Sequence, residues 1–218
     1  QIQALKNPSP NVRELGRARL VASGEKGIPA IKTLLQDPNL FIRGRAIWAL
    51  AKMGPKGLKM VERQLADPNP KIRICAFRAL RHEEHNILTH AANLAKDPSP
   101  MVRREIALAM RYLPLEKSKD ILLNIAQGYD GKDRFYLEAF GIGCTDKEAK
   151  MYPLLKKRSR GSNFDPIYSG LVWRLHPASS IRELKKWAMN EKLDHSIRRS
   201  MLFALSLIEA PQAAEAMV

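Results

Sequence analysis

The chain has 218 residues, of which 45% are hydrophobic, and this is enough to bury a continuous core. It carries 37 Lys and Arg residues against 22 Asp and Glu residues, a net charge of +15, so nucleic acid or another polyanion has to be considered as a partner. No apolar run approaches the roughly 18 residues that a membrane-spanning helix needs, so the composition excludes a membrane span.

A seven-residue motif recurs every 30 residues along the first half of the chain. It reads Asp-Pro-Asn-Leu-Phe-Ile-Arg at residues 37–43, Asp-Pro-Asn-Pro-Lys-Ile-Arg at 67–73 and Asp-Pro-Ser-Pro-Met-Val-Arg at 97–103, with a weaker copy at 7–13. Repeats of this length are typical of solenoids, in which each helical hairpin buries its apolar face against its neighbours. Solenoid surfaces serve binding, so we expect a binding protein and no enzymatic activity.

Within each repeat the apolar residues follow two helical faces. The first helix carries columns four residues apart, namely Val12, Ile42, Ile72 and Val102, then Gly16, Ala46, Ala76 and Ile106, then Leu20, Leu50, Leu80 and Met110. Gly24 and Gly54 look like left-handed helix ends, after which a second helix is expected. Its columns are Ile31, Val61, Ala91 and Ile121, then Leu35, Leu65, Ala95 and Ile125. Each second helix ends at an Asp-Pro corner, because proline excludes the preceding residue from helical angles.

The regular repeats cover residues 7–127, and the period loosens over residues 128–218. Segments that begin at Asp133, Asp165 and Asp194 look like degenerate first helices, which brings the prediction to an all-α solenoid of about seven hairpins in a single domain. The polar stretch 156–163 is predicted to be an enlarged loop. Both ends of the chain fall inside apolar helices without polar caps, so we expect a piece of a longer polypeptide.

An arginine column runs in step with an aspartate column at the corners between repeats. Guanidinium groups repeated along a groove would match phosphates or carboxylates. The paired aspartates favour a structural interpretation instead, a ladder of partly buried ion pairs that orients the stack. Its members are Arg13, Arg43, Arg73, Arg103, Asp37, Asp67 and Asp97.

A second basic set has no matching acidic column. It contains Arg45, Lys52, Lys59, Arg63, Arg78 and Arg81 in the regular repeats, and Lys156, Lys157, Arg158 and Arg160 in the polar stretch. If these residues converge they form a binding surface for a polyanion, and if they do not they are scattered, solvated charges. The sequence leaves both alternatives open.

Histidine and tryptophan residues are the other candidates for a site. Residues 82–85 (His-Glu-Glu-His) with His90 offer ligands that zinc accepts, but the spacing matches no zinc-binding helix and favours an exposed polar turn. We therefore expect no metal and no other cofactor. Trp48, Trp173 and Trp187 would suit base stacking if they faced a groove, although packing between helices is favoured.

The cysteines and the remaining patterns point to no catalytic centre. Cys75 lies in an apolar first helix and Cys144 follows a glycine-rich helix end, so no disulfide is expected between them. The sequence shows no Ser-His-Asp pattern, no phosphate-cradling glycine loop and no haem-attachment motif. No catalytic residue is therefore assigned.

The regular half resembles the HEAT-like repeats named after phycobilisome lyases. Their Asp-Pro-x-Pro-x-Val-Arg-x-x-Ala signature stands at residues 67–76 as Asp-Pro-Asn-Pro-Lys-Ile-Arg-Ile-Cys-Ala. The resemblance implies an armadillo-like α-solenoid of HEAT-like hairpins and no particular activity.

The less regular half resembles the repeat region of large membrane-bound dehydrogenase-type proteins of planctomycetes and Bacteroidetes. The likeness lies in residues 136–143 (Tyr-Leu-Glu-Ala-Phe-Gly-Ile-Gly), 165–166, 171–177 and 210–217. In that family the repeats lie between a sorbosone-dehydrogenase-like β-propeller and a cytochrome c domain. The resemblance implies an extracytoplasmic parent that oxidises a sugar-like substrate, in which this chain is a docking scaffold.

These observations favour a non-catalytic solenoid that binds protein, above all neighbouring domains of its own polypeptide, through the concave face formed by the second helices. A nucleic-acid-binding module such as an alkylpurine DNA glycosylase, with a basic concave face, is the alternative that the net charge favours. A bilin lyase shares the repeat but needs a cluster of pocket ligands that the sequence does not place.

Overall fold

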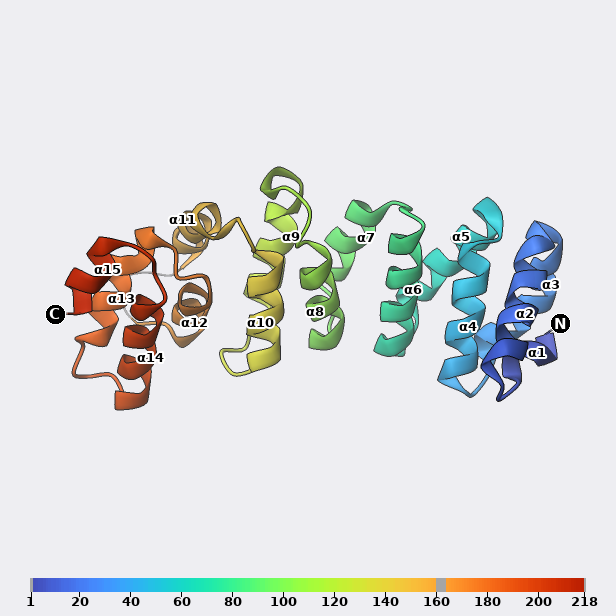
Figure 1. Cartoon of the computed structure of the whole chain (residues 1–218), viewed down its shortest axis with the longest axis horizontal. Coiled ribbons are helices and arrows are strands. Elements are labelled where there is room, and N and C mark those ends of the chain that lie inside the picture. The colour runs from blue at the N-terminus through green and yellow to red at the C-terminus, as the bar shows by residue number, and fades with distance from the viewer. Residues whose placement is uncertain (1, 160–163, 218) are drawn as a thin grey trace. The chain divides into compact units, whose positions relative to one another are not determined.

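A computed structural model describes residues 2–159 and 164–217 (Figure 1). These ranges contain helices and turns and no β-strand, which confirms the predicted all-α solenoid class. The chain divides into two compact units, which we call unit 1 (Gln1–Ala91) and unit 2 (Ala92–Val218). The division falls inside α7 (Ile87–Leu94), and residue 127, where the repeats lose their regularity, lies within unit 2.

In unit 1 first helices and second helices alternate along the chain. After α1 (Ile2–Lys6), the first helices are α2 (Pro10–Ala22), α4 (Leu40–Ala51) and α6 (Pro70–His82). The second helices are α3 (Ile28–Lys32), α5 (Gly54–Arg63) and α7, with the 3₁₀ turns η1 (Gly24–Gly27), η2 (Thr33–Gln36) and η3 (Gln64–Ala66) beside them. Helix α4 packs against α2 and α6, and α5 packs against α4 and α6 (Figure 1).

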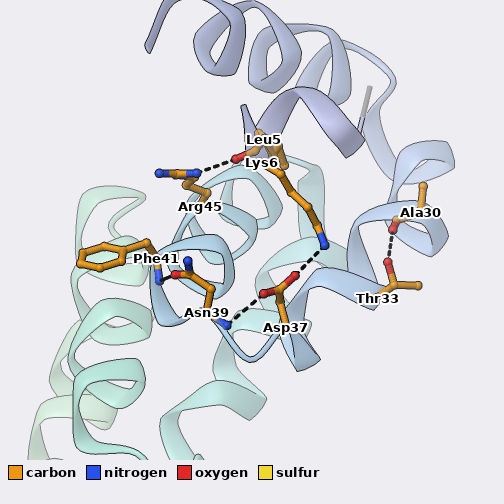
Figure 2. Close-up of polar contacts among 8 residues, drawn as sticks. All are labelled: Leu5, Lys6, Ala30, Thr33, Asp37, Asn39, Phe41 and Arg45. Carbon is orange, nitrogen blue, oxygen red and sulfur yellow. Dashed lines mark hydrogen bonds and ion pairs between the residues drawn. The ribbon is translucent and has the colours of Figure 1, made fainter. Parts of the chain in front are cut away.

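The Asp-Pro corners begin the first helices as the motif predicts. In the second repeat the Asp37 Oδ1 accepts a hydrogen bond from the Asn39 N–H at 2.9 Å, and the Asn39 side chain accepts one from the Phe41 N–H at 2.9 Å (Figure 2). Asp67 and Asn69 repeat this arrangement at the start of α6. The corner therefore satisfies N–H groups that the first turn of a helix leaves without partners.

The predicted apolar columns form the core of unit 1. Ile72, Leu50, Ile31 and Val61 are each at most 1% exposed. One expectation was wrong, because Val12 is 41% exposed. It occupies the same column as Ile72, which is 1% exposed, so the column by itself does not decide burial. The repeat register predicts burial only where a neighbouring repeat supplies the covering face.

Gly24 and Gly54 end the first helices of unit 1 at φ values of +55° and +80°, as the sequence predicts. In the third repeat the same column holds Glu84, which adopts φ +53°, and Asn86 follows at φ +48°. The left-handed turn is thus retained at Glu84, where glycine is replaced, although a residue with a Cβ is strained in this conformation.

Unit 2 continues the alternation with longer and less regular connections. Its first helices are α8 (Pro100–Ala109), α10 (Arg134–Gly143), α12 (Pro166–Leu175) and α14 (His195–Ser206). Its second helices are α9 (Leu115–Gln127), α11 (Glu148–Arg158), α13 (Ile181–Ala188) and α15 (Pro211–Met217), with η4 (Ala178–Ser180) before α13. Helix α10 packs against α8 and α12, and α13 packs against α14 and α15. The degenerate first helices predicted near residues 133, 165 and 194 are therefore present.

The sequence predicts an enlarged loop over residues 156–163, but the first three of these residues are helical. Residues 156–158 form the last turn of α11, because the buried Tyr152 and Leu155 continue its apolar face. The Lys156 Nζ lies 3.5 Å from a carboxylate oxygen of Glu183 and ties this turn to α13. Arg160 and the three residues after it lie outside the described ranges. No described helix is long and apolar enough to cross a membrane.

Candidate functional site

A groove of about 820 Å³ runs over the first helices of unit 1. Helices α1, α2, α4 and α6 all contribute to its walls. The apolar lining residues are Leu5, Leu40, Phe41, Trp48, Ile72 and Cys75, and the charged ones are Arg13, Glu14, Arg17, Arg45 and Lys71. An apolar surface rimmed by several cations and one carboxylate is suited to an apolar side chain flanked by acidic groups.

Phe41 is the most exposed large apolar side chain of this groove, at 78%. The corner hydrogen bonds of Asn39 fix the main chain of Phe41 in the first turn of α4, where its side chain projects from the helix (Figure 2). Trp48, two turns further along α4, is half-buried and packs edge-on against His82 with ring centroids 5.7 Å apart. Exposed aromatic rings on a rigid helix are typical anchors of protein interfaces.

The arginines of the groove are held by internal contacts. Arg45 donates from Nη1 to the Leu5 carbonyl oxygen at 2.7 Å, and this bond fixes α1 against α4 (Figure 2). Arg17 donates from Nε to the Glu14 carboxylate at 2.9 Å. That hydrogen bond raises the pKa of Arg17 and lowers the pKa of Glu14. Lys71 is exposed, so it offers a cation to a ligand.

The predicted arginine and aspartate columns lie at the corners, where three of the arginines contact main-chain carbonyl groups. Arg13, Arg73 and Arg103 each donate from Nη1 to two carbonyl oxygens of their own corner, at 2.5–3.1 Å. Arg43 forms an ion pair with Asp67 of the next repeat. Asp37 pairs instead with Lys6 at 2.7 Å, and Asp97 accepts from the Ser99 N–H at 2.8 Å. Arg13, Arg73 and Arg103 thus fasten the turn of their own corner to the helix that follows it, whereas Arg43 links two repeats.

The predicted basic surface is spread over several helices. Only Arg45 lines the groove, whereas Lys59 and Arg63 lie exposed on α5. Lys52 pairs with Glu83 at 3.1 Å. The remaining members are Arg78 and Arg81 on α6, Lys156, Lys157 and Arg158 in unit 2, and Arg160, which falls outside the described residues. Arg45 is therefore the member of this predicted surface that the groove of unit 1 contains.

The tryptophans of unit 2 lie in packed surroundings. Trp187 is 4% exposed and packs edge-on against Tyr168 and Phe164, with ring centroids 5.9 Å apart in both pairs. The guanidinium of Arg134 covers the ring of Trp173 at 4.7 Å. A smaller hollow of about 350 Å³ adjoins Trp173 and Arg134. The ring of Trp173 is thus covered by a cation of the same chain, whereas Trp48 lines the larger groove of unit 1.

Both cysteines are free thiols. Burial raises the pKa of Cys75, and it raises the pKa of Cys144 to about 12. Thiols with raised pKa values are poor nucleophiles, since the thiolate is the reactive form.

The histidine turn (residues 82–85) and His90 form contacts that the sequence does not predict. His82 and Glu83 pair with each other at 2.9 Å, whereas His85 and His90 both approach Glu62 of α5. Glu62 was not among the candidate residues, because it lies 23 residues before His85 and only the packing of α5 against the turn brings them together.

The groove was also missed, although the sequence held one signal for it. Phe41 occupies the motif position that Asn11, Lys71 and Met101 hold in the other repeats. An aromatic residue in a column otherwise filled by polar or flexible side chains marks an exposed ring.

Comparisons with known proteins support part of the expected resemblance. Residues 2–81 match the family model described as HEAT repeats. No curated protein matches the chain. A crystal structure of an engineered protein is similar at 14% identity and a TM-score of 0.43, over 94% of this chain and 66% of that one. The chain thus spans about two thirds of the length of that protein.

None of these matches bears on the expected link to dehydrogenases and cytochromes c. The match to HEAT repeats covers α1 to α6 and includes every helix that lines the groove. Residues 2–81 of this α-solenoid are therefore a HEAT-like repeat region.

Proposed function

We propose that the chain is a non-catalytic docking scaffold that binds a segment of another protein in the groove of unit 1. The single observation that carries the proposal is the pairing of an exposed aromatic anchor, Phe41, with a rim of cations on a HEAT-like repeat region. HEAT repeats serve protein interactions, and the groove lies on the first helices, not on the second-helix face expected from the sequence.

The chemistry of the groove specifies the segment. Its apolar lining favours one or two large apolar side chains, which gain about 25 cal/mol for each Å² removed from water. Its rim favours aspartate or glutamate beside them, because Arg13, Arg45 and Lys71 leave a net positive charge near Phe41. The ligand is therefore an acidic peptide with an apolar anchor.

Nucleic acid is the second candidate, and the charge of unit 1 favours it. Unit 1 contains 16 Lys and Arg residues against seven Asp and Glu residues. Two features of the groove oppose it: Glu14 lies in the wall, and Arg17 already binds that carboxylate. A phosphate backbone is charged along its whole length and would meet this carboxylate, whereas a peptide can place its apolar side chain beside Glu14 and its acidic groups beside the cations.

Selection from a displayed peptide library tests the proposal. We expect enriched sequences that carry Asp or Glu beside a large apolar residue. Phe41→Ala should weaken binding of the consensus peptide at least about 10-fold, since buried aromatic anchors contribute most of the affinity at such interfaces. The matched control is Phe135→Ala, because Phe135 on α10 is 76% exposed and lies outside the groove.

Charge reversal supplies a second pair of variants. Lys71→Glu should weaken binding of the acidic consensus peptide and reduce its salt dependence, whereas Lys59→Glu on α5 should change neither. Equal affinity of the wild type and Phe41→Ala for every selected peptide would refute docking in this groove.

We further propose that the bound segment belongs to the same polypeptide as this chain. The resemblance to dehydrogenase and cytochrome c proteins favours a neighbouring domain of the same polypeptide. The consensus peptide should then match a sequence encoded in the same reading frame, and the recombinant segment that contains it should bind the wild type and not Phe41→Ala. A consensus absent from that reading frame would assign the groove to a separate protein.

A further inference from the structure

Three side chains with metal-binding atoms converge on the second-helix side of unit 1. The Nε2 of His85 lies 3.0 Å from the Oε1 of Glu62, and the Nε2 of His90 lies 3.3 Å from the same oxygen. The ligand atoms of all three side chains fall within 4.8 Å of one another. Glu62 comes from α5, His85 from the turn before α7, and His90 from α7.

We propose that Glu62, His85 and His90 form a binding site for one zinc ion. Two imidazoles and one carboxylate are a ligand set that zinc accepts in proteins, with a fourth position left for water. The site is distinct from the groove, which lies on the first helices, so the proposal stands or falls independently of the docking function.

Two of the three separations between ligand atoms fit four-coordinate zinc. Bonds of about 2.0–2.1 Å at tetrahedral angles place neighbouring ligand atoms about 3.3 Å apart. The two separations of the Glu62 oxygen from the imidazole nitrogens, 3.0 and 3.3 Å, match this value within a few tenths of an ångström. Small side-chain rotations would therefore admit the ion without movement of the helices.

The burial of His90 gives an independent reason for a ligand here. Its side chain is 12% exposed, and its Nε2 is buried without a hydrogen bond in the described structure, although Glu62 is only 3.3 Å away. The ring nitrogen and the carboxylate are thus close without the alignment that a hydrogen bond requires. A metal ion between them would satisfy both atoms.

The protonation states also suit a metal. Burial lowers the pKa of His90, which favours the neutral imidazole that zinc requires. Burial of Glu62 opposes its charged form, but hydrogen bonds from His85 and Asn86 outweigh this effect and lower its pKa. The cluster therefore presents a carboxylate beside an imidazole that resists protonation.

The backbone of the turn holds His85 in place. Glu84 and Asn86, on either side of it, both adopt left-handed φ values, and the His85 N–H donates to the Leu80 carbonyl oxygen at 2.9 Å. Repeats 1 and 2 have glycine in the column of Glu84. Zinc at this position would link α5 of one repeat to the turn and α7 of the next.

Titration of the metal-free full chain with Zn²⁺ by calorimetry, and with Co²⁺ by visible absorption, tests the site. We expect one equivalent to bind, with a Co²⁺ spectrum of the intense four-coordinate type and no thiolate charge-transfer band. Glu62→Gln and His90→Gln should each weaken Zn²⁺ binding at least about 10-fold, the smallest loss typical even of outer-shell partners.

The matched control is His82→Gln. His82 is 58% exposed and lies three residues from His85, but it pairs with Glu83 outside the cluster, so its loss should change the zinc Kd less than about 2-fold. Circular dichroism of each variant reports whether the fold is retained, and Glu62→Gln keeps the shape of the side chain. Zinc binding by the wild type weaker than about 100 μM, or unchanged in Glu62→Gln and His90→Gln, would overturn the proposal.

Discussion

At the scale of single residues, the corners between repeats concentrate the polar contacts that define the fold. Arg73 and Arg103 fasten main-chain carbonyl groups of the Asp-Pro turns, and Arg43 forms an ion pair with Asp67. Main-chain carbonyl oxygens do not titrate, so these contacts hold over a wide pH range. The corner at Asp37 differs, because its carboxylate is paired with a lysine.

Asp37 should make the free energy of unfolding of unit 1 depend on pH in the acidic range. The hydrogen bond from Lys6, at 2.7 Å, and that from the Asn39 N–H lower the pKa of Asp37 below its ordinary value of 3.8 (Figure 2). A carboxyl group with a depressed folded-state pKa stabilises the fold above its unfolded pKa, and this contribution is lost as the pH falls through the folded value. Asp37→Asn should therefore have a lower Tm than the wild type at pH 6, and the difference should shrink as the pH falls below 3.8.

The measurement is thermal unfolding of both proteins from pH 6.5 to pH 3. Glu25→Gln is a suitable comparison, because Glu25 of η1 pairs with Lys56 of α5 and both side chains are more exposed than those of Asp37 and Lys6. A constant difference in Tm between the wild type and Asp37→Asn across this range would contradict the assignment.

At the scale of the helices, close crossings depend on residues without a side chain. A Cβ at position 57 would overlap the Leu50 carbonyl oxygen, where α5 crosses the end of α4, and a Cβ at position 143 would overlap the Ala107 carbonyl oxygen, where α10 meets α8. In both places the obstacle is main chain, which cannot rotate away. The crossing distance is therefore fixed by glycine.

Gly57→Ala and Gly143→Ala should each destabilise the chain by about 1–3 kcal/mol, the usual cost of overpacking. Gly44→Ala is the matched control. Gly44 lies inside α4, and a Cβ there would lie 3.5 Å from the Cys75 Sγ of α6, which is an ordinary van der Waals contact. That substitution should stabilise the protein by up to about 1 kcal/mol, because alanine favours the helical state. Denaturant unfolding measures all three, and an effect of Gly57→Ala equal to that of Gly44→Ala would show that the α4–α5 crossing relaxes freely.

At the scale of the whole molecule, the net charge of +15 favours non-specific binding to polyanions. Charge spread over many helices binds phosphate backbones without a defined site, and such binding falls steeply with salt because it releases counterions. We expect weak association with duplex DNA at 50 mM salt that disappears by about 200 mM. Phe41→Ala should leave this association unchanged.

Fluorescence anisotropy of a labelled duplex, measured against salt concentration, checks this expectation. DNA binding that persists at 200 mM salt and is lost in Phe41→Ala would assign the groove to nucleic acid instead of protein. Loss of DNA binding in Lys71→Glu alone would add no such support, because any single charge change lowers non-specific affinity.

The sequence by itself determined the class of the fold and most of its core. The 30-residue period, the Asp-Pro corners and the glycine turns specify local geometry, and Leu50, Ile72 and Val61 are buried because every hairpin must cover its apolar face. These features depend on residues close together in the chain, which is why a periodic pattern reveals them. Val12 shows the limit, since its burial requires a covering neighbour.

Only the tertiary structure decided where the candidate sites lie. Glu62 meets His85 and His90 through the packing of α5 against the next turn, and Phe41 gains a rim of cations from α2 and α6. The convergence of side chains from different helices depends on crossing distances and rotations about helix axes. The repeat pattern specifies which face of a helix points inward, but not which side chains of separate helices come within bonding distance.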